Sequence, residues 1–130
     1  MTARYVNTSV KRREDPTLLL GRARFMGDLS LPGLRAVAFL RSPHAHARIV
    51  AIDASDACKL PGVEAVVTGA DLAATTRPVR TELSGDNYKE TGWPALAQGK
   101  TRFVGEPVVA VVASDRYRAE DALDVIKVTY

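Results

Sequence analysis

The most constraining part of this sequence is its end, where an unbroken apolar run extends from Val108 to Ala113. A run of six apolar residues fills both faces of a strand, so it predicts a strand in the middle of a sheet. Farther on, Ile126, Val128 and Tyr130 alternate with polar residues, which is the pattern of a half-buried strand. The fold therefore has to accommodate one fully buried strand and one half-buried strand close together in the chain.

Between these two strands the sequence predicts a short helix. Ser114 or Asp115 is its expected N-cap, because either side chain can accept a hydrogen bond from a free backbone N–H group of the first turn. Ala119, Ala122 and Leu123 recur at helical spacing and form the expected inner face. The last residues of the chain are thus predicted to fold as strand, helix and strand.

The same plan is predicted earlier in the chain, over residues 48–68. Ala54, Ala57 and Cys58 fall on one face of a short helix, which makes Cys58 a small core residue and not a reactive thiol. The other parts of this unit are a strand at residues 48–52, a helix cap at Asp53, a stop at Pro61-Gly62 and a strand at residues 64–68. Two units with such short helices predict an α+β fold, layered in the manner of α/β proteins, and disfavour a doubly wound nucleotide-binding sheet.

A length of 130 residues fits a single domain, 1–130. Residues 1–33 lack periodicity and contain glycine and proline breaks, so they predict an extended N-terminal arm with turns. Leu18-Leu19-Leu20, with Phe25 and Leu29, would pin this arm to the body. Directly after the arm, the apolar residues 36–40 predict a buried strand.

Residues 73–100 predict a long loop or insertion, because they contain few aliphatic side chains. An internal segment of this length without secondary structure is usually functional or disordered. Trp93, the only tryptophan, lies in it. An exposed tryptophan there would anchor a partner; folding of Trp93 back on the domain is the favoured interpretation.

Positive charge is concentrated in the first 50 residues, which contain nine Lys or Arg and three acids, a net charge of +6. The remaining 80 residues contain nine basic and twelve acidic groups, a net charge of −3. A basic segment is typical of a surface for nucleic acid or an acidic partner, or of a solvated arm. The aromatic residues near Lys11, Arg12 and Arg13 are too few for a stacking platform, which disfavours nucleic acid as a partner.

The sequence also bears on location. Its longest apolar run has six residues, whereas a membrane-spanning helix needs about 20. The N-terminus contains no apolar segment of the secretory kind. Cys58 is the only cysteine, so an internal disulfide is impossible. These features predict a cytoplasmic protein without membrane contact.

Candidate catalytic and metal-binding groups are sparse. His44 and His46, the only histidines, would share one face of a strand, but no third zinc ligand is convincingly placed, so packing and hydrogen bonding of the turn is favoured. Glu82, Asp86 and Glu90 lie in the long loop, whereas a general acid or base must be held rigidly. Phosphate-binding glycine motifs and the nucleophile-elbow motif do not occur. The sequence predicts no catalytic, cofactor-binding or metal-binding residue.

A series of different short motifs extends along nearly the whole chain. They are Arg12-Arg13-Glu14-Asp15-Pro16, Gly21-Arg22-Ala23-Arg24-Phe25, Leu31-Pro32-Gly33, the run Arg41 to Ile49, Leu60-Pro61-Gly62-Val63, Thr68-Gly69-Ala70-Asp71-Leu72, Val104-Gly105-Glu106-Pro107-Val108 and Ala119-Glu120-Asp121-Ala122. In this order they resemble the N-terminal a/b hammerhead domain of the molybdopterin-binding large subunit of the xanthine dehydrogenase, aldehyde oxidase and carbon monoxide dehydrogenase family. Residues 73–93 match no motif of the family.

The resemblance implies an a/b hammerhead fold and a non-catalytic structural role within a molybdenum hydroxylase. Such enzymes hydroxylate an aldehyde or an aromatic heterocycle, or oxidise carbon monoxide. The complete enzyme is expected to contain molybdopterin, iron–sulfur clusters of the 2Fe-2S type and FAD. The pterin contacts and the catalytic glutamate are expected in later domains, beyond Tyr130, so the 130-residue chain alone is expected to be inactive.

The expected partners are the remaining molybdopterin-binding domains, the iron–sulfur subunit and the flavin subunit of the same enzyme. The basic arm is expected to supply part of an interface with them. Its candidate interface residues are Lys11, Arg12, Arg13, Arg22 and Arg24. The alternative is a free-standing interaction or regulatory module that shares the fold without the enzyme.

Overall fold

The computed structural model describes residues 9–80, 85, 87–89 and 91–130. By its internal contacts the chain divides into two units, Met1–Gly33 and Leu34–Tyr130. The acids Glu82, Asp86 and Glu90, considered above as loop residues, lie outside the described residues.

The N-terminal unit contains a short helix, α1 (Asp15–Leu19), with Pro16 in its first turn. Proline is well placed there, because a backbone N–H group in the first turn would find no acceptor within the helix, and proline has no N–H group. The helix is followed by Gly21, whose φ of +64° suits glycine, and the Arg22 backbone N–H donates to the carbonyl of Thr17 at 2.9 Å. The arm expected from the sequence thus contains one short helix, which a glycine in the left-handed conformation ends.

A 3-10 helix, η1 (Met26–Asp28), follows, and its entry is fixed by the Phe25 N–H, which donates to the Asp28 carboxylate at 2.9 Å. The side chains that were expected to pin the arm, Leu18-Leu19-Leu20, Phe25 and Leu29, are exposed. Met26 is exposed as well. The N-terminal unit therefore presents large apolar side chains on its surface.

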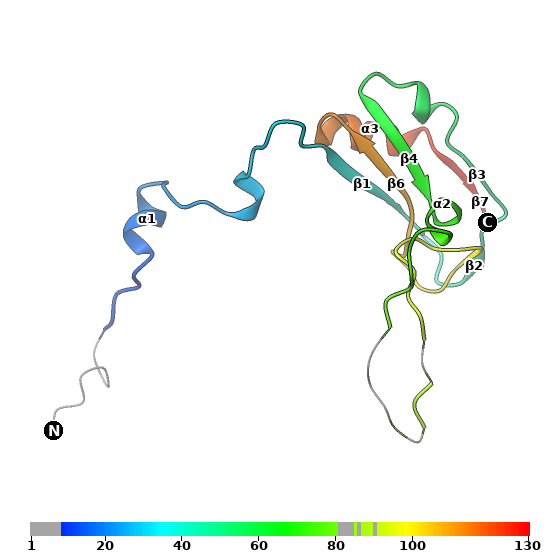
Figure 1. Cartoon of the computed structure of the whole chain (residues 1–130), viewed down its shortest axis with the longest axis horizontal. Coiled ribbons are helices and arrows are strands. Elements are labelled where there is room, and N and C mark those ends of the chain that lie inside the picture. The colour runs from blue at the N-terminus through cyan, green and yellow to red at the C-terminus, as the bar shows by residue number, and fades with distance from the viewer. Residues whose placement is uncertain (1–8, 81–84, 86, 90) are drawn as a thin grey trace. The chain divides into compact units, whose positions relative to one another are not determined.

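The second unit is built on a three-stranded antiparallel sheet in which β6 (Pro107–Ala113) lies between β1 (Ala36–Arg41) and β4 (Val63–Thr68) (Figure 1). The central strand predicted at residues 108–113 is confirmed. The strand predicted at residues 36–40 is also present, but it is an edge strand and not a buried one. Burial alternates along β1, because its side chains point in turn to the covered and the uncovered face of the sheet, so apolar composition alone overestimated the burial of this strand.

One face of this sheet is covered by α3 (Arg116–Asp124). Asp115 is its N-cap, as predicted, and its carboxylate accepts a hydrogen bond from the Arg118 N–H at 3.0 Å. The predicted inner face is confirmed as well, because Ala119 and Ala122 are fully buried and Leu123 packs against the core.

Two smaller antiparallel ladders complete this unit. β2 (Ala47–Arg48) pairs with β5 (Lys100–Thr101), and β3 (Ala51–Asp53) pairs with β7 (Lys127–Thr129). The strand predicted at residues 48–52 is therefore divided between two ladders. The predicted strand–helix–strand unit at 48–68 is not one unit of a single sheet, because β4 belongs to the larger sheet.

The helix predicted between β3 and β4 is a single 3-10 turn, η2 (Ala57–Lys59). A 3-10 helix has three residues per turn, so neighbouring side chains point about 120° apart. Ala57 consequently faces the core while Cys58 is exposed, and the expected core position of Cys58 is wrong. Asp53 is not its cap either, because its carboxylate accepts from the Ser55 N–H at 3.0 Å and the Ser55 hydroxyl at 2.7 Å.

Helix α2 (Gly69–Ala73) ends at the first residue of the segment 73–100 that was predicted as a long loop. Thr68 and Asp71 form a capping box, in which the Thr68 N–H donates to the Asp71 carboxylate at 2.7 Å. Farther along, Val79 and Trp93 exchange backbone hydrogen bonds of 2.8 and 2.9 Å, so the two limbs of the segment run side by side there (Figure 1).

Gly69 is the position where packing leaves least room. A Cβ atom added there would overlap the carbonyl of Ala97. We therefore predict that Gly69→Ala lowers the free energy of unfolding of the full chain by about 1–3 kcal/mol, the usual cost of overpacking. Gly27→Ala is the matched control, because nothing lies within 4 Å of its added Cβ. Urea unfolding of both variants checks this, and equal effects would contradict it.

The N-cap of α3 makes stability depend on pH. The Arg118 N–H, and then the Ser114 hydroxyl, lower the pKa of Asp115 below its ordinary value of 3.8. Because the folded-state pKa is the lower one, the cap stabilises the fold at pH values above 3.8, and this contribution is lost as the pH falls through the folded-state value. Asparagine also caps helices but does not titrate.

We therefore predict that Asp115→Asn loses less stability than the unaltered chain between neutral pH and acid pH. The measurement is the urea midpoint of both chains across that range. The same acid-induced loss in both would show that Asp115 does not contribute to the pH dependence.

Candidate functional site

Two of the sequence motifs, the run 41–49 and the run 104–108, meet in space. The Ser42 N–H donates to the carbonyl of Glu106 at 2.9 Å, and the carbonyl of Ser42 accepts from the Gly105 N–H at 2.8 Å. The Arg41 guanidinium donates to the carbonyl of Gly105 at 2.9 Å. Gly105 has a φ of +87°, a conformation that glycine adopts without strain. We call this meeting point the motif junction; it comprises residues 41–44 and 101–106.

The inside of the motif junction is polar and buried. Ser42 is 2% exposed, and its hydroxyl accepts from the His44 N–H at 3.0 Å. The same hydroxyl lies 3.3 Å from that of Thr101, which is fully buried and donates to the carbonyl of Ala47 at 3.4 Å. Buried hydroxyl groups are costly unless hydrogen-bonded, so these contacts tie β1, β2 and β5 together.

Glu106 contributes a buried charge to the motif junction. Its carboxylate accepts from the backbone N–H of Arg102 and pairs with the Arg102 guanidinium at 3.2 Å, while the Glu106 side chain is only 7% exposed. Sequence reasoning included Glu106 in a family motif but assigned it no role. The available signal was a charged residue between Gly105 and Pro107, directly before a strand that is otherwise apolar.

The two histidines do not form a metal site. The chain from Ser42 to His46 is irregular, so the expected placement of both imidazoles on one face of a strand is wrong. The His44 ring instead contacts Tyr130 edge to face, with ring centroids 4.7 Å apart. Among the residues that the structure describes, no group of three or more His, Cys, Asp or Glu side chains is arranged to hold a metal ion.

A hollow of about 750 Å³ lies beside the motif junction. It is lined by Thr91, Gly92, Trp93, Pro94, Arg102, Phe103, Glu106 and Pro107. Trp93 is 64% exposed, and its indole N–H donates to the Thr91 hydroxyl at 3.3 Å. The expectation that Trp93 folds back on the domain is therefore wrong. Its exposed face, together with that of Phe103, gives the hollow an aromatic wall.

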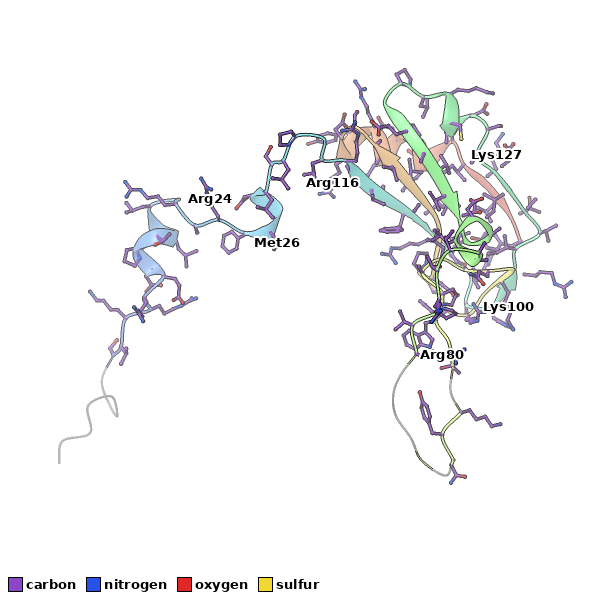
Figure 2. The ribbon with its side chains drawn as sticks, in the orientation of Figure 1. Arg24, Met26, Arg80, Lys100, Arg116 and Lys127 are labelled. Atoms are coloured by element: carbon purple, nitrogen blue, oxygen red, sulfur yellow. The ribbon has the colours of Figure 1, made fainter. Side chains whose placement is uncertain are left out.

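The five cations of the expected interface all belong to the N-terminal unit and are all exposed. α1 separates Lys11, Arg12 and Arg13 from Arg22 and Arg24. Arg12 lies 3.9 Å from Glu14 and 4.0 Å from Asp15, in exposed ion pairs that contribute little to stability. Figure 2 shows the side chains of Arg24 and Met26 projecting from the ribbon, so cations and apolar groups are displayed together.

Residues 20–130 match the family description "Aldehyde oxidase and xanthine dehydrogenase, a/b hammerhead domain". This is most of the chain. The chain belongs to this family. The resemblance inferred from the motifs is confirmed, and so is the α+β hammerhead fold.

Individual hammerhead relatives show where such a domain occurs. The 6-hydroxypseudooxynicotine dehydrogenase complex subunit gamma of Paenarthrobacter nicotinovorans is 42% identical over 130 residues, which cover 97% of this chain and 16% of that subunit. The crystal structure of quinoline 2-oxidoreductase from Pseudomonas putida 86 is 54% identical, with a TM-score of 0.89, over 95% of this chain and 16% of that chain.

A third relative, the Cu,Mo-CO dehydrogenase, is 41% identical with a TM-score of 0.79, over 93% of this chain and 15% of that chain. This chain thus spans about one-sixth of the length of the relatives that it matches. The domain is one of molybdenum hydroxylase family enzymes.

None of the described helices has the length and apolar character that a membrane crossing requires.

The Arg102–Glu106 pair, in which Glu106 is buried, has a counterpart in Arg116–Glu120, in which both side chains are exposed, and both pairs join residues four apart. We predict that Glu106→Ala lowers the free energy of unfolding by about 1.5–3 kcal/mol, because hydrogen bonds to a charged group in a buried turn are lost. Glu120→Ala should change it very little, since exposed ion pairs on helices contribute little. Urea unfolding of the two variants provides the comparison, and a loss at Glu120 as large as that at Glu106 would refute the structural role of the turn.

Proposed function

We propose that this chain is a non-catalytic structural domain of a molybdenum hydroxylase, packing against the molybdopterin-binding domains and the iron–sulfur subunit. One observation carries the proposal. The buried polar side chains of the described chain are Ser42, Thr101 and Glu106, and all three are engaged in the motif junction. The interior polar groups thus maintain the architecture, in a domain that makes up about one-sixth of its relatives.

The names of the relatives support a setting within a larger assembly. The Paenarthrobacter relative is a subunit of a dehydrogenase complex, and the carbon monoxide dehydrogenase is a copper and molybdenum enzyme. The side chains that the structure describes offer no three-ligand group of His, Cys, Asp or Glu for a metal ion. In line with the family resemblance, we assign molybdopterin, the iron–sulfur clusters and FAD to other parts of the enzyme, and assign no catalytic step to this chain. A cytoplasmic location stays a prediction from the sequence.

Purification of the protein from its native source tests the proposal. Molybdenum, iron and flavin are measured in the same fraction as this chain, together with oxidoreductase activity on aldehydes and aromatic heterocycles. The proposal predicts that all three cofactors accompany the chain. A homogeneous preparation free of molybdenum, iron and flavin would contradict it and favour a free-standing module.

We also propose that the N-terminal cations take part in the subunit interface. The proposal rests on their exposure and on the apolar side chains displayed beside them, such as Leu19 and Met26. An interface of this composition gains contact area from the apolar groups and orientation from the charges.

In the complete enzyme, reversing Lys11, Arg22 and Arg24 to glutamate should weaken subunit association, because attraction to an acidic partner surface becomes repulsion. The matched control reverses the exposed Lys59, Lys100 and Lys127, which gives the same change in net charge. Association is measured by size-exclusion chromatography at low and high salt, with iron and flavin counted per chain. Unchanged assembly of the first variant would rule out the interface.

A further inference from the structure

The three-stranded sheet has two unlike faces. The face under α3 is packed, because the buried helix residues Ala119 and Ala122 belong to the same hydrophobic clusters as alternate residues of the strands. These strand residues are Ala38 and Leu40 of β1, Val109, Val111 and Ala113 of β6, and Val63 and Val66 of β4. Val108 of β6, beside the register shift at Leu40/Arg41, is buried in the same cluster. Side chains alternate across a strand, so the residues between them point to the opposite face.

The opposite face is apolar at all six of its central positions. They are Val37 and Phe39 of β1, Ala110 and Val112 of β6, and Ala65 and Val67 of β4. The register confirms that they share a face, since Val112 is paired with Val37 and Ala65, and Ala110 is paired with Phe39 and Val67. We call these six residues the open face.

No buried cluster of the described chain includes a residue of the open face. Val37 is 50% exposed and Phe39 is 44% exposed, both on the edge strand β1, whereas Ala110 of the central strand is 9% exposed. An antiparallel sheet with one solvated face normally places polar side chains on that face. A continuous apolar face on a sheet instead marks a contact surface.

Charged groups frame the open face at both ends. At one end the Arg35 guanidinium and the Glu64 carboxylate form an ion pair that links the start of β1 to the start of β4. At the other end the Arg41 guanidinium lies over the Phe39 ring, 5.9 Å from its centroid. An apolar centre with a polar rim is the usual anatomy of a protein interface. The small side chains of Ala65 and Ala110 leave room at the centre for close approach.

We propose that the open face docks an apolar segment of the molybdopterin-binding domains of the same enzyme. This inference rests on the proposed function and adds the surface and the occupant. About five-sixths of each relative's chain lies outside the matched region, so most of such an enzyme is available as a partner for this face. The absence of charge at the six central positions suits a permanent contact, like the interior of a domain, more than the reversible contact of separate subunits.

Photo-crosslinking in the complete purified enzyme tests the docking. Phe39 is replaced by the aromatic photo-crosslinker p-benzoylphenylalanine, and the cross-linked peptides are identified by mass spectrometry. Tyr117 carries the same replacement as the control, because it is an exposed aromatic residue on α3, which covers the other face of the sheet. The expected result is a cross-link from position 39 to a molybdopterin-binding domain and none from position 117 to that peptide.

The remaining outcomes each overturn the inference. Cross-links from position 39 to the iron–sulfur subunit, to a second copy of this chain, or to nothing would assign the open face differently while leaving the proposed function intact. Cross-links from positions 39 and 117 to the same peptide would show that this peptide does not contact the open face in preference to α3. Failure of the proposed function is separate, since the chain would then purify without molybdenum, iron, flavin or larger domains.

Discussion

The hydrogen bonds between Ser42 and the turn at residues 102–106 are the interaction on which the rest of the domain depends. They continue the β1–β6 ladder beyond the end of the sheet, because β1 ends at Arg41 and β6 begins at Pro107. The turn itself depends on the left-handed conformation of Gly105 and on the buried Glu106 carboxylate. Local backbone geometry and one buried charge thus position two distant parts of the chain.

Residues 36–53, which include the Ser42 side of this junction, contribute one strand to each of the three sheets. β1 pairs with β6, β2 with β5, and β3 with β7, so one stretch of chain is in contact with three later strands. The Ile49 N–H donates to the carbonyl of Gly99 at 2.9 Å, which continues the connection between the ladders. A domain organised in this way uses its buried polar groups for architecture, while several large apolar side chains stay exposed. This distribution agrees with a structural role in a larger enzyme.

The sequence predicted those elements whose signal is local. Val108 to Ala113 is apolar at every position and is the central strand, and Asp115 caps its helix. Prediction was wrong where local spacing permits two geometries, as at Cys58, which helical spacing placed in the core but a 3-10 turn exposes. The burial of Glu106 could not be predicted, because its carboxylate is enclosed by a turn with Arg102 that forms only where residues 101–106 meet Ser42. The five arm cations were identified from the +6 charge and the lack of periodicity of the arm, and their role stays a prediction.

Amide hydrogen exchange of the full chain tests the central claim most directly. If the motif junction stabilises the whole domain, the N–H groups of Ser42, Arg102 and Gly105 exchange only through global unfolding, at rates matching the slowest amides of β6. Each of these N–H groups donates a hydrogen bond within the junction. Exchange as fast as that of the exposed Gly92, with β6 still protected, would show that the junction opens independently and would contradict the claim.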